Sequence, residues 1–159
     1  MWMLLSQSIE KIGREFGMPL DDSFYSQSVT NFKDAFLEIF SDAVILEEEH
    51  RNFEFMGSFK LVYLYVPLSY NIIVENELRT FTIIIEDNKA AANLYHIKKF
   101  DNHLCEKNIV DSLIILKNVL LENRFDFYIW KSGKLYKKNA EGLKRIKDIN
   151  KHLKETLDK

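Results

Sequence analysis

The middle of the chain is dominated by strand-like segments that follow one another with short connections. Residues 59–66 are rich in β-branched and aromatic side chains, and residues 70–74 and 81–85 flank a polar segment in which Asn76 and Glu77 are the expected turn. Connections this short favour antiparallel pairing, because parallel neighbours need a crossover of about a dozen residues or more. The pattern therefore predicts an antiparallel meander of about six to eight strands.

Other segments complete the expected sheet. Three consecutive isoleucines at residues 83–85 predict a central strand that is covered on both faces. Residues 87–92 are expected to form a loop, and residues 93–100 one more strand. A last hairpin is expected within residues 125–136.

Helical periodicity brackets these strands. Residues 5–16 and 29–41 predict two N-terminal helices, separated by a loop at residues 18–28. A wide apolar stripe over about 104–122 predicts a helix buried against the sheet, and a second stripe over 143–157 predicts a C-terminal amphipathic helix. Strands bunched together with helices before and after them indicate the α+β class, in one domain that takes in all 159 residues.

The composition excludes several classes of protein. Hydrophobic residues make up 47% of the chain and aromatic residues 13%, which excludes a disordered chain. The single cysteine, Cys105, excludes a disulfide scaffold and fits a reducing compartment. The chain has no apolar stretch of about 18 residues, and its N-terminal apolar segment is too brief for a signal peptide. We therefore expect a cytoplasmic protein with no membrane partner.

The chain carries no familiar catalytic motif. Its five glycines are scattered, so neither a P-loop nor a dinucleotide fingerprint is present, and we expect no cofactor and no small-molecule substrate. The densest set of reactive side chains is Asp101, His103, Cys105 and Glu106. No further ligand stands at a spacing typical of zinc, so we expect no metal and interpret the set as a helix N-terminus that favours acids. The alternative is an enzyme with a dispersed site around His96, His103 and Glu106.

Carboxylates are concentrated in residues 10–54, which hold 11 acidic and 4 basic side chains. Glu47, Glu48 and Glu49 are expected at the end of a strand, where no fold needs three adjacent carboxylates. One interpretation is a basic partner that relieves their repulsion, and the other is solubility or protection of a strand edge. Strand tyrosines, and any sheet face left without helices, would add to a surface for a protein partner. The expected contact residues are Asp21, Asp22, Glu47, Glu48, Glu49, Glu54, Tyr63 and Tyr65.

The C-terminal residues 131–159 are basic, with ten Lys and Arg against four acids. Trp130 and Tyr136 stand close by, so a nucleic-acid surface is one interpretation. The favoured interpretation is a solvated helix face, because the lysines surround the polar side of the expected C-terminal helix and acids interrupt them. Nucleic acid is therefore not the expected partner. The basic residues are Lys131, Lys134, Lys137, Lys138, Lys144, Arg145, Lys147, Lys151 and Lys154.

Four features give the chain a family likeness: an acidic N-terminal half, the expected antiparallel sheet flanked by helices, the hairpin FDFYIWKSGKLY at residues 125–136 and a lysine-rich last helix. The chain resembles the bacterial immunity proteins of polymorphic toxin and contact-dependent inhibition systems. The resemblance implies a non-enzymatic protein that binds a cognate toxin, such as a basic nuclease domain, with fixed stoichiometry and occludes its active site. A secretion chaperone or adaptor for an effector protein is a second expectation, and the dispersed-site enzyme is a third.

Overall fold

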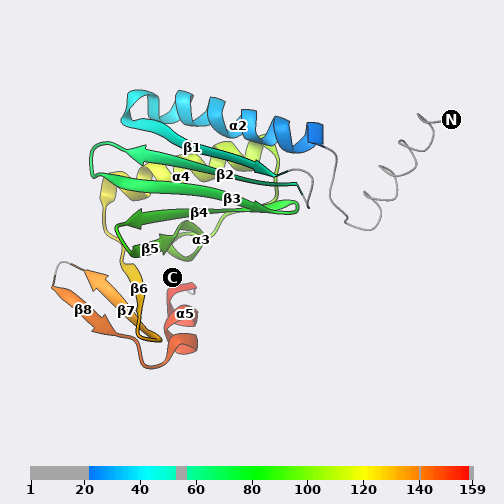
Figure 1. Cartoon of the computed structure of the whole chain (residues 1–159). Helices are drawn as coiled ribbons and strands as arrows, with labels where there is room; N and C mark the ends of the chain where they lie inside the picture. Colours follow the sequence, from blue (N-terminus) through cyan, green and yellow to red (C-terminus); the bar gives the residue numbers. More distant parts are fainter. Residues whose placement is uncertain (1–21, 53–56, 140, 158–159) are drawn as a thin grey trace.

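The computed structural model describes residues 22–52, 57–139 and 141–157. Figure 1 shows the strands β1–β5 with α2 above them and α4 behind, and β6–β8 with α5 in the lower part of the molecule. The strands are β1 (Val44–Asn52), β2 (Ser58–Tyr65), β3 (Tyr70–Glu77), β4 (Thr80–Asp87), β5 (Ala90–Asn93), β6 (Phe127–Lys131), β7 (Lys134–Asn139) and β8 (Gly142–Arg145). The helices are α2 (Asp22–Phe40), the 3-10 turn η1 (Ser41–Ala43), α3 (Leu94–Ile97), α4 (Glu106–Glu122) and α5 (Ile149–Leu157).

The eight strands form one sheet in which their order in space is their order in the chain. Each strand pairs antiparallel with the next, which confirms the α+β class and the antiparallel meander. The pairing is uneven, because β5 and β6 share a single pair of opposed residues, Ala91 and Tyr128. Strands β1 and β8 are the two edges of the sheet.

The core lies between one face of the sheet and the helices α2 and α4, which pack on each other. Aromatic side chains fill it. Phe36 of α2 stacks on Tyr63 of β2 with ring centroids 3.9 Å apart, and Phe32 meets Phe81 of β4 edge to face at 5.1 Å. Such ring pairs contribute about 0.5–1.5 kcal/mol beyond the area they bury, so they fix α2 over the first four strands.

Helix α4 confirms the buried helix expected at about 104–122. Its apolar stripe recurs every three or four residues, and Ile109, Leu113, Leu116 and Leu120 are almost fully buried. The helix ends at Asn123, whose left-handed backbone (φ +48°) places its N–H on the carbonyl of Val119. Asparagine tolerates this conformation better than most residues, so it ends the helix at low cost.

The N-terminal region differs in part from the expectation. The predicted helix at residues 5–16 lies outside the described residues. The second helix, expected over 29–41, begins seven residues earlier at Asp22, so the predicted loop at 18–28 is wrong over its described part. Tyr25 and Ser28 are buried, so the buried face of α2 that contains Val29 extends one helical turn further toward the N-terminus. An acidic residue in the first turn suits the positive end of the helix, so a loop-like sequence begins a helix instead.

One predicted loop and one predicted strand are also wrong. Residues 90–93 form β5 where a loop was expected, and the expected strand at 93–100 contains the short helix α3. The side chain of Asn93 accepts a hydrogen bond from the N–H of Tyr95 at 3.0 Å, and Leu94 is fully buried. Asparagine is a favoured N-cap, so it starts a helical turn where apolar alternation suggested a strand.

The C-terminal helix is shorter than expected. Residues 142–145 form strand β8, which pairs with β7, and α5 begins only at Ile149. The three-residue spacing of Leu143 and Ile146 fits a helical repeat. The same residues are also compatible with a short strand that follows a glycine turn. Gly142 has φ +115°, a conformation that side-chain-bearing residues rarely adopt. This glycine therefore turns the chain back on β7 instead of allowing a helix.

Candidate functional site

The three adjacent glutamates lie inside β1 instead of at its end. Leu46 stands opposite Tyr63 and Glu48 opposite Val62, so Glu47 is an extra residue at a bulge. A bulge resets the alternation of the strand. After it, Glu48 faces away from the helices while Glu49 faces α2. Glu47 and Glu48 are exposed at the edge strand; Glu48 Oε2 lies 3.3 Å from the exposed ring of His50, and within the described residues neither carboxylate is paired with a lysine or an arginine.

Glu49 has a structural role that the sequence did not reveal. Its Oε1 accepts from Lys33 Nζ of α2 at 3.4 Å and from the Arg51 guanidinium of β1 at 3.2 Å. Partial burial acts to raise the pKa of Glu49, but the hydrogen bonds from Arg51 and Lys33 outweigh it and hold that pKa below its usual value. The expectation that all three carboxylates lack a structural use is therefore wrong for Glu49.

Tyr63 and Tyr65 lie in the core instead of on an exposed surface. They are 4% and 6% exposed and pack against Phe36 and Phe40 of α2. Burial, and then the charge of Glu49, raise the pKa of the Tyr63 hydroxyl well above its usual value. Buried side chains offer nothing to a partner, so we correct the assignment of both tyrosines to a contact surface.

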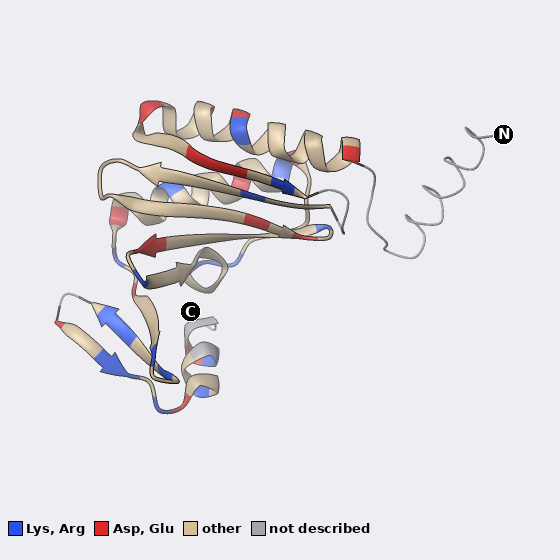
Figure 2. Cartoon of the chain, in the orientation of Figure 1, with Lys and Arg blue, Asp and Glu red and all other residues tan. Residues whose placement is uncertain are grey.

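The remaining expected acidic contacts are divided. Asp22 is exposed in the first turn of α2, whereas Asp21 and Glu54 lie outside the described residues. Residues 22–52 hold seven carboxylates and only two basic side chains, Lys33 and Arg51. Figure 2 shows these acids at both ends of α2 and along β1, at the opposite edge of the sheet from the basic strands β7 and β8. The split charge of the sequence is thus a split between the two edges of one sheet.

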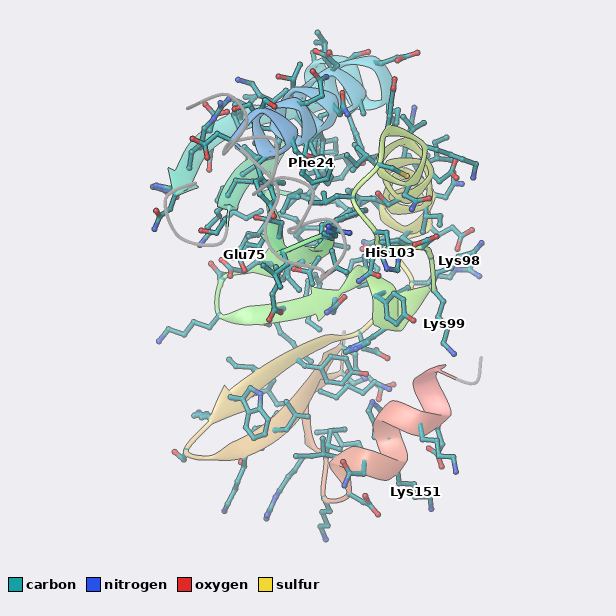
Figure 3. All side chains as sticks on the ribbon, turned by 90° about the vertical axis from the view of Figure 1, so that its right-hand side faces the viewer. Phe24, Glu75, Lys98, Lys99, His103 and Lys151 are labelled. Atoms are coloured by element: carbon teal, nitrogen blue, oxygen red, sulfur yellow. The ribbon has the colours of Figure 1, made fainter. Side chains whose placement is uncertain are left out.

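One face of the sheet is left without a helix. Figure 3 shows α2 above the strands and α4 to their right, with Glu75 on the left-hand side, which none of the described helices covers. Val62, Ile73 and Ile84 stand directly opposite one another across β2, β3 and β4 on this side. Ile84 is partly exposed between two fully buried isoleucines, so the predicted cover on both faces is wrong.

We call this surface the open face. Its apolar centre gains Leu64 and Ile45, which are opposed across β1 and β2, and Ile45 is 53% exposed. Carboxylates border the centre, and the one lysine among them forms an ion pair with Glu75 at 3.6 Å. The open face consists of Ile45, Glu48, Lys60, Leu64, Ile73, Glu75, Ile84 and Glu86, and Val62 points to the same side but is only 8% exposed.

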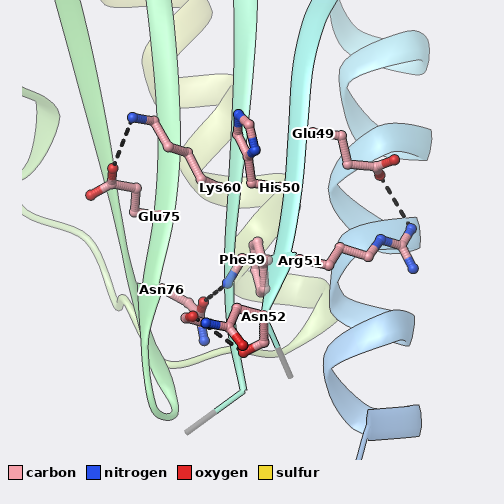
Figure 4. A pocket seen from close by; sticks show the side chains of 9 residues that line it. Glu49, His50, Arg51, Asn52, Phe59, Lys60, Glu75 and Asn76 are labelled. Atoms are coloured by element: carbon pink, nitrogen blue, oxygen red, sulfur yellow. Dashed lines mark hydrogen bonds and ion pairs between the residues drawn. The ribbon is translucent and has the colours of Figure 1, made fainter. Parts of the chain in front are cut away.

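An open hollow lies at one end of the open face, between β1, β2 and β3 (Figure 4). Asn76 forms its floor, where its Oδ1 accepts from the Phe59 N–H at 2.7 Å and its amide donates to the Gly57 carbonyl at 2.9 Å. The charged groups around it pair with one another, as Glu49 does with Arg51. Asn76 thus bonds backbone groups on two sides, and the hollow lies where these strand ends are joined.

The reactive residues near the start of α4 form a surface turn. His103 Nδ1 lies 2.9 Å from Asp101 Oδ1, and that carboxylate also accepts from the His103 backbone N–H. These two hydrogen bonds lower the pKa of Asp101. Cys105 is exposed, and Glu106 begins α4 as expected. The contacts hold a loop in place, and none of these side chains lines the hollow.

Within residues 22–52, 57–139 and 141–157, no three His, Cys, Asp or Glu side chains are grouped so that they could hold a metal ion. None of the helices in the same ranges has the length and apolar character needed to cross a bilayer. No protein-family model, no curated protein and no solved structure matches the chain. The candidate site therefore depends on the geometry of the chain itself.

Sequence reasoning missed most residues of the open face. It anticipated that an uncovered sheet face would suit a partner, but it expected aromatic side chains there. The aromatic residues point into the core, and the outward positions are the aliphatic Val62, Ile73 and Ile84. The available signal was that apolar residues occupy both the inward and the outward positions of β2 and β3. That signal alone could not say which face the helices cover.

Proposed function

We propose that this chain is a non-enzymatic inhibitor that binds a basic toxin domain through the open face and the neighbouring carboxylates of β1, as an immunity protein does in the cytoplasm. The observation that carries the proposal is the apolar centre of the open face with its acidic border. Protein interfaces combine an apolar centre with a polar rim, and this surface has that arrangement. Binding would occlude the toxin, and it requires no catalysis by this chain.

Ile45 is the residue of the open face with most to gain from a partner. Full burial of an isoleucine contributes about 1.5–3 kcal/mol, and about half of its side-chain area is still exposed here, so covering it adds about 1 kcal/mol. Leu64, Ile73 and Ile84 are partly exposed and add smaller amounts. The apolar centre therefore supplies a local anchor of a few kcal/mol, as in the small group of residues that dominates many interfaces.

Glu47 and Glu48 supply the charge that attracts a basic partner. Exposed charges at the rim of an interface raise the association rate and its dependence on salt more than they raise affinity. Glu49 is excluded from this role because Lys33 and Arg51 already hold it. The acidic edge is therefore expected to steer the partner toward the open face.

The test uses the basic domain encoded by the gene adjacent to the one for this chain, because immunity proteins and their toxins are neighbours. We expect a 1:1 complex by light scattering and rescue of growth when both are produced together. Ile45→Arg removes apolar area and adds a charge that repels a basic partner, so we expect it to weaken binding by about tenfold or more, which corresponds to about 1.4 kcal/mol. Ile73→Ser should weaken binding without any change of charge.

The matched control is Leu121→Arg. Leu121 is 66% exposed on α4, on the helical side of the sheet, so the same type of substitution should leave binding unchanged. Equal affinities of the wild type, Ile45→Arg and Ile73→Ser would contradict the use of the open face. A dimer of this chain holding an extended client segment would instead support the chaperone alternative.

A further inference from the structure

Several basic residues of the C-terminal region lie on strands and not on a helix. They therefore cannot be explained as the solvated face of a C-terminal helix. Lys144 and Arg145 lie in strand β8 and Lys134 begins β7, so they belong to the end of the sheet and not to a helix. Lys131 stands directly opposite Lys134 across β6 and β7, and Lys137 stands directly opposite Lys144 across β7 and β8. Like charges opposed in this way destabilise a sheet, so the arrangement does not serve folding.

Only some of these charges are neutralised within the chain. The Nζ atom of Lys137 lies 3.0 Å from Asp126 Oδ2, and the Nζ atom of Lys138 lies 3.4 Å from Asp87 Oδ2. Among the residues that the structure describes, Lys131, Lys134 and Lys144 take part in no ion pair, and neither does Arg145. All four are exposed. The end of the sheet thus presents a concentrated positive charge that an anionic chain would relieve.

An exposed aromatic ring lies on the face of the hairpin that also carries Lys144, opposite to the face of Lys131 and Lys134. Trp130, next to Lys131 on β6, is 64% exposed, although tryptophan usually buries most of its area. Its neighbour across the hairpin, Leu135, is buried, so the hairpin is packed while the indole is left outside. An exposed indole offers a flat face on which a nucleic-acid base can stack.

We propose that the β6–β8 end of the sheet binds single-stranded nucleic acid that passes over the tip of the β6–β7 hairpin, with phosphates on Lys131 and Lys134 at that tip and on Lys144, and with one base stacked on Trp130. Single strands expose their base faces, whereas a duplex hides them. Lysine acts as a point charge on phosphate and lacks the planar fork that reads base edges. Binding is therefore tolerant of sequence. An acidic protein segment would use the charges but not the exposed indole, which is why nucleic acid is favoured.

The test uses the full chain carrying Trp2→Phe, so that Trp130 is its one tryptophan. A fluorescein-labelled 12-nucleotide dT oligonucleotide is titrated by anisotropy, and the quenching of Trp130 fluorescence is followed with an unlabelled copy. We expect saturable binding with quenching. The logarithm of the affinity should fall with the logarithm of salt concentration with a slope of about −2, since each phosphate contact of a single strand contributes about −0.7.

Three variants separate the contribution of the phosphate contacts from that of base stacking. Lys131→Gln/Lys134→Gln should reduce the salt slope by about 1.4, because two phosphate contacts are lost. Trp130→Leu should weaken anisotropy-detected binding by about tenfold while leaving the salt slope unchanged, because stacking carries no charge. Lys98→Gln/Lys99→Gln removes two exposed charges away from the β6–β8 end, and it should match the parent chain.

Several results would overturn the proposal. Absence of saturable binding would do so, as would an equal loss of affinity in the Lys98→Gln/Lys99→Gln control. Polyglutamate that competes as well as dT without quenching Trp130 would assign the surface to an acidic protein segment instead. Ile45→Arg, on the open face, should leave nucleic-acid binding intact, so failure of this proposal and failure of the proposed function are distinguishable.

Discussion

Replacing Asn76 with alanine should destabilise the fold far more than the loss of one polar side chain on a strand suggests. Asn76 is nearly buried, and its amide joins three backbone groups from two strand ends. Its Oδ1 accepts from the Phe59 N–H at 2.7 Å, and its Nδ2 donates to the carbonyls of Gly57 at 2.9 Å and Leu78 at 3.1 Å. One side chain therefore fastens the start of β2 to the β3–β4 turn.

The magnitude follows from which groups lose their partner. Phe59 is buried, so Asn76→Ala leaves its N–H unsatisfied at a cost of about 1–3 kcal/mol. The two carbonyls lose ordinary hydrogen bonds worth about 0.5–1.5 kcal/mol each, and water replaces part of that. We expect a total loss of about 2–4 kcal/mol in the free energy of unfolding.

Urea unfolding followed by circular dichroism measures this loss. With a slope of about 2 kcal/mol per molar urea, the midpoint should fall by roughly 1–2 M. The control is Asn71→Ala, because Asn71 also lies on β3 but makes no side-chain hydrogen bond within the described residues. A midpoint shift in Asn76→Ala no larger than in Asn71→Ala would refute the reasoning that unsatisfied backbone groups determine the cost.

Three further outcomes can be measured in the same way. Gly57→Ala should cost more than about 2 kcal/mol, because φ is +61° there and the added Cβ would overlap the buried ring of Tyr25; Gly133→Ala, at φ +71° with open space around it, is the control. Glu49→Gln should cost below about 1 kcal/mol at pH 7, since the pair is partly solvated. Because the folded pKa of Glu49 is lowered, this stabilisation exists above the usual glutamate pKa of 4.5 and should vanish as the pH falls through the folded pKa. The pKa of Tyr63 is raised, so the wild type should lose stability above pH 10.0 relative to Tyr63→Phe; parallel pH curves would contradict this cause.

The sequence predicted the sheet and α4 well because both depend on patterns with one physical solution. Short connections between apolar segments permit antiparallel pairing alone, and the stripe from Ile109 to Leu120 predicts a helix packed into the core. The turns were harder, because their residues serve more than one purpose. Asn76 was expected in a turn, but its amide is used as a clamp, and the chain reverses at Leu78 and Arg79 instead.

The candidate site was predicted less well. An acidic strand at one edge could be inferred from Glu47 and Glu48, but the ion pairs of Glu49 depend on α2 lying beside β1. The open face depends on which side the helices take, which is a tertiary choice that alternation does not encode. The pairing of Lys137 with Lys144 could not be predicted for a related reason. The spacing of Leu143 and Ile146 fits a helix as well as a strand.

The single pair of residues that joins β5 to β6 has a consequence for motion. One residue pair, Ala91 and Tyr128, joins β5 to β6, so separating the last three strands from the first five breaks few backbone hydrogen bonds, together with the Lys138–Asp87 ion pair and the packing of Phe127 on Tyr70. Local opening of this kind requires less free energy than global unfolding, and it divides a continuous sheet into two cooperative units. The basic end can then exchange its amides with solvent, or adjust to what it meets, while the open face keeps its shape.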